Sequence, residues 1–130
     1  MANKLILDSD FLYGLFVEED PHHENCQKLL LKIENAQILI SNLVIYEMLT
    51  LLSRRISQIA SKSFIEDLEA LGIQKIFIDQ NLEAEILKEF LSYSKKNISF
   101  VDCSNLILAQ KYKSKIASFD KFYPKSYLLN

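Results

Sequence analysis

Short apolar runs alternate along the chain with longer segments in which apolar residues recur at helical spacing. Consecutive apolar residues are typical of strands that are covered on both faces. The pattern predicts four short strands, at residues 4–7, 37–40, 75–78 and 115–119. It predicts helices over residues 11–17, 21–35, 43–60, 61–71, 82–94 and 102–113, and a fifth, edge strand at 126–129.

Capping and turn residues agree with several of these boundaries. Asp20-Pro21 is a typical helix start, because Asp can cap and Pro fits the first helical position. Gly72 is expected to end a helix, and Asp79 or Asn81 is expected to cap the next one. Strands of about four residues that alternate with helices predict an α/β fold with mainly parallel pairing and helices on both sheet faces.

Composition narrows the class of protein further. A length of 130 residues fits one domain over residues 1–130. Two glycines and two prolines are too few for an all-β or disordered chain, or for a Gly-rich phosphate loop. Cys26 and Cys103 show no zinc pattern, so we expect free, buried thiols. The N-terminus does not resemble a signal peptide, and no run suits a membrane helix; we expect a cytoplasmic protein.

Charge is distributed unevenly along the chain. Residues 1–87 carry seven Lys/Arg and 14 Asp/Glu, a net charge of −7, whereas residues 88–130 carry eight Lys and three Asp/Glu, a net charge of +5. A basic C-terminal third could contact phosphates, and a solvated lysine face is an equally good interpretation.

Four acids fall at or near the predicted carboxyl edge of the sheet, where ligands bind in such folds. Asp8 directly follows the first strand, and Asp120 directly follows the fourth. Glu47 lies in the first turns of the helix after the second strand, and Asp102 starts the helix that leads into the fourth. We therefore expect the fold to gather these four side chains.

Gathered carboxylates repel one another unless a positive charge compensates. A hard divalent cation such as Mg²⁺ or Mn²⁺ prefers oxygen ligands, and it can activate water and stabilise charge on a phosphodiester. Each acid also has an ordinary interpretation: Asp102 could be a helix cap, Glu47 could be merely exposed, and Asp120 could begin a turn.

At these residues the chain resembles the PIN-domain ribonuclease family, including the VapC-like toxins of toxin–antitoxin pairs. The resemblance rests on four blocks in the family's order, at residues 5–10 (LILDSD), 40–47 (ISNLVIYE), 99–109 (SFVDCSNLILA) and 116–122 (IASFDKF).

The resemblance implies a three-layer α/β/α fold and a metal-dependent endoribonuclease. It assigns the catalytic and metal-binding roles to Asp8, Glu47, Asp102 and Asp120. It also implies an RNA substrate, a cognate antitoxin and a homodimer. Further candidates are Ser9 and Ser118 as residues that steady the site, and Lys111, Lys113 and Lys121 as phosphate contacts.

Two departures from the family pattern leave alternatives open. Asp10 stands where a small neutral residue is more usual, so it adds charge or faces away. No further acid follows Asp120 in the sequence Lys121-Phe122-Tyr123. The Asp8/Asp10 spacing also fits a haloacid-dehalogenase-like phosphatase, although no Gly-Thr follows Asp10. A catalytically inactive PIN-like module that binds RNA or protein is the non-enzyme alternative.

Overall fold

The computed structural model describes residues 3–33 and 35–129. Its strands are β1 (Lys4–Leu7), β2 (Gln37–Ser41), β3 (Gln74–Ile76) and β4 (Lys115–Ala117). Its helices are α1 (Ser9–Phe16), α2 (His23–Leu31), α3 (Asn42–Arg55), α4 (Gln58–Leu71), α5 (Gln80–Ser92) and α6 (Phe100–Tyr112), with a short 3-10 helix at Lys125–Tyr127. The predicted helix over 21–35 runs through residue 34, which lies outside the described residues.

The four strands form one parallel sheet in the order β3-β2-β1-β4. This confirms the predicted parallel α/β fold. Because all four strands point the same way, their carboxyl ends meet at one edge of the sheet. The predicted edge strand at 126–129 was wrong: the 3-10 helix takes up its first two residues, and only Leu128 pairs, in a single bridge to Ile116.

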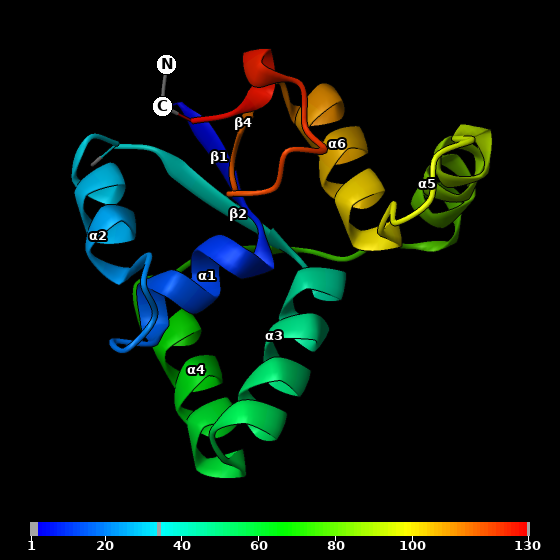
Figure 1. Ribbon diagram of the computed structural model, residues 1–130. Coiled ribbons are helices and arrows are strands. Elements are labelled where there is room, and N and C mark those ends of the chain that lie inside the picture. Colours follow the sequence, from blue (N-terminus) through cyan, green and yellow to red (C-terminus); the bar gives the residue numbers. More distant parts are fainter. Residues whose placement is uncertain (1–2, 34, 130) are drawn as a thin grey trace.

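Helices cover both faces of the sheet, as the consecutive apolar residues of β1 require. Leu5 and Leu7 pack into a core shared with α1, α3 and α4, whereas Ile6 packs into a second core shared with α5 and α6. Figure 1 shows α6 on one side of the strands and α1 and α2 on the other. The fold is therefore the expected three-layer α/β/α arrangement.

The boundary between α3 and α4 lies earlier than predicted. The helix expected over 43–60 ends at Arg55, and α4 already begins at Gln58. The Ser57 hydroxyl accepts a hydrogen bond from the backbone N–H of Ala60, so Ser57 caps the second helix and fixes the break. Gly72 ends α4 in the left-handed conformation, as predicted (φ 66°).

The two cysteines are free and buried, as expected from their apolar surroundings. Burial raises the pKa of each thiol to about 11. In the part of the chain that the structure describes, no helix is both long enough and apolar enough to cross a membrane.

Candidate active site

Asp8 lies at the carboxyl end of β1 and is 4% exposed. Its Oδ1 accepts hydrogen bonds from the Ser9 backbone N–H (2.8 Å) and from the Asn105 side-chain amide (3.1 Å). Its Oδ2 is contacted by the hydroxyls of Ser118 (2.9 Å) and Tyr123 (3.0 Å). Burial, reinforced by the nearby Asp10, raises the pKa of Asp8 to about 6.

Asp102 lies in the first turn of α6 and is also buried. It does not cap this helix, because the Ser99 hydroxyl accepts hydrogen bonds from the backbone N–H groups of Val101 and Asp102. The capping interpretation of Asp102 is therefore wrong, and its carboxylate is left for the site. Burial raises its pKa to about 8, with further contributions from Asp8 and Asp120.

The Tyr123 hydroxyl links these two acids. It lies 3.0 Å from Asp8 Oδ2 and 3.2 Å from Asp102 Oδ1, and it accepts a hydrogen bond from the Asn105 amide at 3.1 Å. Tyr123 is 3% exposed. Sequence reasoning missed Tyr123, because aromatic residues were assigned to the core, and it also missed Asn105. Asn105 follows Asp102 by one helical turn, which is the signal that could have identified it.

Asp10 faces the site and adds charge to it, which decides between the two alternatives left by the sequence. Its Oδ2 accepts hydrogen bonds from the Phe119 backbone N–H (2.9 Å) and the Ser118 hydroxyl (3.2 Å). Its Oδ1 is buried without a hydrogen-bond partner. Burial raises the pKa of this carboxyl, and the nearby Asp120 contributes.

Glu47 approaches from α3 and joins the site through Ser9. The Ser9 hydroxyl donates a hydrogen bond to Glu47 Oε1. Because Ser9 also gives its backbone N–H to Asp8, it connects the acid of α3 with the acid at the end of β1. Glu47 is half-buried, so the interpretation of a merely exposed residue does not describe it.

Asp120 lies in the segment after β4, slightly further from the sheet than predicted. The strand ends at Ala117, so two residues lie between it and Asp120. The Asp120 side chain accepts a hydrogen bond from the Phe122 backbone N–H (2.9 Å), which makes a local turn. The Ser118 hydroxyl contacts the Asp120 backbone N–H at 3.0 Å, in addition to Asp8 and Asp10.

The three candidate lysines lie at opposite ends of the molecule. Lys121 directly follows Asp120, at the acidic end. Lys111 lies in the last turn of α6 and Lys113 caps its C-terminus, at the end of the helix remote from Asp102. The structure therefore does not bring Lys111 and Lys113 to the acids, and a phosphate contact by these two lysines stays a prediction.

The residues present suit a hard divalent cation. Their donor atoms are oxygens, burial raises the pKa of three neighbouring carboxyl groups, and Oδ1 of Asp10 and of Asn105 is buried without a partner. Over residues 3–33 and 35–129, however, no three His, Cys, Asp or Glu side chains are grouped closely enough to form a complete metal site. The acids meet through Tyr123, Ser118 and Ser9 rather than around one shared point.

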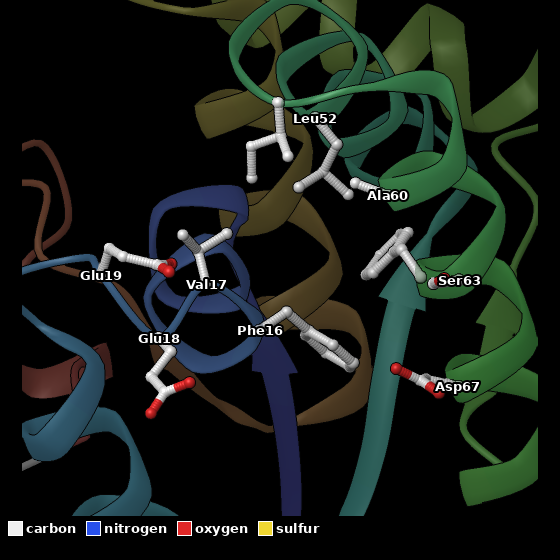
Figure 2. Close-up of a pocket in the computed structure, with 10 residues that line it drawn as sticks. Phe16, Val17, Glu18, Glu19, Leu52, Ala60, Ser63 and Asp67 are labelled. Carbon is white, nitrogen blue, oxygen red and sulfur yellow. The ribbon is translucent and has the colours of Figure 1, made fainter.

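A separate cleft of about 280 Å³, with both apolar and polar lining, lies between α1, α3 and α4. Its apolar lining includes Phe16, Leu52 and Ile56, and acidic residues lie around it (Figure 2). The acids are Glu18, Glu19 and Asp67. None of the candidate site residues lines this cleft, so it is a different surface from the acidic edge.

Comparison with known proteins agrees with this architecture. The PIN domain family profile matches residues 5–125. No curated protein sequence matches the chain. The fold is similar to that of VapC20 from Mycobacterium tuberculosis, a toxin that cleaves the sarcin-ricin loop, with a TM-score of 0.82 and 21% identity over 91% of each chain.

A second similar structure is that of VapBC2 from Rickettsia felis bound to a DNA fragment from its promoter. The TM-score is 0.63 and the identity 16%, over 90% of this chain and 88% of the other. At these identities the two structures show a common fold, and the family match covers nearly the whole sequence. This chain is therefore a member of the PIN domain family.

Proposed function

We propose that the protein is a divalent-metal-dependent endoribonuclease and acts as the toxin of a toxin–antitoxin pair. PIN-domain nucleases generally use divalent metal ions, and the fold is like that of VapC20, which cleaves the sarcin-ricin loop. The observation that carries the proposal is the convergence of Asp8 and Asp102. These two carboxylates come from distant parts of the chain, are buried, and contact the same tyrosine hydroxyl.

In this proposal Asp8 and Asp102 hold the cation, and Glu47 and Asp120 complete its surroundings. Bound Mg²⁺ or Mn²⁺ would supply two effects, a lower pKa for water and stabilisation of negative charge on the phosphodiester. A cation also favours the ionised form of both carboxyl groups, whose pKa values are raised. Cation binding should therefore release protons and strengthen as the pH rises.

Neighbouring side chains orient the acids for this role. The Asn105 amide and the Ser118 hydroxyl hold the two oxygens of Asp8, and Ser9 orients Glu47. Such contacts around the ligands fix the carboxylate orientation before a cation or substrate binds. Ser9 and Ser118 are therefore proposed as positioning residues.

Two alternatives remain to be compared with this proposal. Membership of the PIN domain family leaves the haloacid-dehalogenase-like phosphatase without support, although Asp8 and Asp10 share contacts with Ser118. A module that binds RNA without cutting it would keep the same fold. Direct measurement of RNA cleavage separates these proposals.

The test is cleavage of single-stranded RNA by the purified protein with Mg²⁺ or Mn²⁺ and with EDTA. We expect cleavage only with the metal, and a loss of more than about 100-fold in Asp8→Asn and in Asp102→Asn. Asp67→Asn is the matched control, because Asp67 is an exposed acid on α4 away from the site. Full activity in either site variant would contradict the proposal.

The proposed partners are a cognate antitoxin and a second copy of the chain. The cleft of Figure 2 suits an amphipathic antitoxin segment with basic residues, because its lining combines apolar side chains with acids. Exposed Phe77, Leu87 and Leu91 support a homodimer through the region of β3 and α5. Light scattering of the purified protein tests the dimer, and co-expression with the reading frame upstream of this one tests the antitoxin.

A further inference from the structure

A second cleft, of about 600 Å³, borders the acidic site at Asp120. One wall is the end of α5 and the loop that follows it, and the other is the segment after β4. Side chains that could contact a nucleotide are concentrated in its lining, namely Tyr93, Lys95, Asn97, Lys121 and Phe122. The volume is within the range of about 300–1,000 Å³ that is typical of ligand pockets.

Aromatic side chains connect this cleft with the acids. The Tyr93 and Phe122 rings lie 5.5 Å apart between centroids, and the Phe122 and Tyr123 rings lie 5.3 Å apart. The row ends at the Tyr123 hydroxyl, which contacts both Asp8 and Asp102. Bases of single-stranded nucleic acid stack on such side chains largely irrespective of sequence.

Two exposed lysines, Lys95 and Lys121, lie on opposite walls of the same cleft. Neither forms an ion pair within residues 3–33 and 35–129, so their ammonium groups can reach phosphates. The nearby negative groups are Asp120 in the lining and Glu89 beside Tyr93. The cleft therefore combines cationic and aromatic groups directly beside a proposed catalytic acid.

We propose that this cleft binds the single-stranded RNA segment next to the phosphodiester that is cut. Tyr93 stacks on a base, and Lys95 and Lys121 contact the phosphates. The inference rests on the proposed nuclease function and adds to it the path of the substrate, along the aromatic row and away from Asp8 and Asp102. Lys95 and Tyr93 become substrate contacts that the sequence pattern did not identify.

The test is the affinity for a fluorescein-labelled single-stranded oligoribonucleotide, measured by anisotropy in EDTA over a series of salt concentrations. EDTA prevents cleavage and isolates contacts made by the protein itself. We expect Lys95→Ala/Lys121→Ala to weaken binding and to reduce the slope of log Kd against log salt by about 1.4, because each lost phosphate contact on a single strand contributes about 0.7. Tyr93→Ala should weaken binding by about 5-fold to 50-fold, and Tyr93→Phe should restore it.

Lys111→Ala/Lys113→Ala is the matched control, because it removes the same charge at the opposite end of α6. It should keep the affinity and salt slope of the unmodified protein apart from small changes. An equal loss in this control would overturn the inference, since the lysines would then act only through overall charge. Melting temperatures of all variants show that they are folded.

The outcomes distinguish this inference from the proposed function. If the protein cuts RNA with Mn²⁺ but the Lys95/Lys121 and Tyr93→Ala variants bind RNA normally, the cleft is not the RNA site and serves a protein segment or nothing. The absence of RNA binding in EDTA at low salt would overturn it equally. Cleft-dependent binding without cleavage under any metal condition would retain the inference and refute the nuclease.

Discussion

The two ends of α6 carry polar residues in contrasting environments. At the N-terminal end, Asp102 and Asn105 are buried beside Asp8, and the pKa of Asp102 is raised to about 8. At the C-terminal end, about 15 Å from Asp102 along the helix axis, Lys111 and Lys113 are exposed to solvent. Burial of the Asp102 carboxylate raises the free energy of the folded protein, whereas the two exposed lysines carry no such cost. Buried acids without a compensating charge are therefore the feature that indicates function, more than the number of charges.

The largest effect is expected from Asp102→Asn at the buried end, measured as the free energy of unfolding in the absence of metal. The folded protein keeps the Asp102 proton up to about pH 8, whereas the unfolded chain loses it near pH 4. Between these values the folded state binds the extra proton, so the free energy of unfolding falls as the pH rises. The variant removes this penalty and should be more stable than the parent protein by several kcal/mol at pH 8, since about four pKa units at about 1.4 kcal/mol each set an upper bound of about 6 kcal/mol.

Urea unfolding in EDTA at pH 4 and pH 8 measures this effect. The gain from Asp102→Asn should be absent at about pH 4 and appear as the pH rises, with Asp67→Asn flat throughout. A variant that is less stable than the parent protein at both pH values would mean that the Asp102 carboxylate is well compensated.

A smaller change is expected from removing the hydroxyl that links the acids. Tyr123→Phe keeps the buried ring but removes the single O–H donor that lies within reach of both Asp8 and Asp102, and the oxygen that accepts from Asn105. We expect a loss of about 1 kcal/mol in the same urea experiment. Tyr127→Phe is the control, because Tyr127 lies in the 3-10 helix away from the site. Equal losses in the two variants would show that the bridge contributes nothing specific.

The smallest effect is expected at the opposite end of the helix. Lys113 has a left-handed backbone (φ 52°), which glycine adopts without strain. Lys113→Gly should therefore stabilise the fold by about 0.5 kcal/mol and leave RNA cleavage unchanged. Loss of cleavage in this variant would make the basic end part of the catalytic machinery after all.

The sequence was sufficient for the fold because its signals are local. Consecutive apolar residues in β1 predicted a strand covered on both faces, and Gly72 correctly ended a helix. The break at Ser57 was misplaced, because a serine is compatible with both a helix interior and a cap. The edge strand at 126–129 failed because its pairing depends on neighbours that the local pattern does not specify.

The site was less predictable because it depends on contacts between distant residues. The four acids were expected at one edge, and the structure brings Asp8 and Asp102 to the same tyrosine. Asp10 could not be placed from the sequence, since the direction of its side chain depends on Phe119 and Ser118. Tyr123 was missed because a buried aromatic ring does not reveal where its hydroxyl points.

The most direct test of the central claim is a calorimetric titration of the protein with Mn²⁺ at pH 8, beside Asp8→Asn. We predict that the protein binds Mn²⁺, releases protons as it does so, and loses at least about 10-fold in affinity when Asp8 is replaced. Equal affinity in the two proteins, or no Mn²⁺ binding by either, would contradict the claim that these carboxylates are gathered to hold a cation.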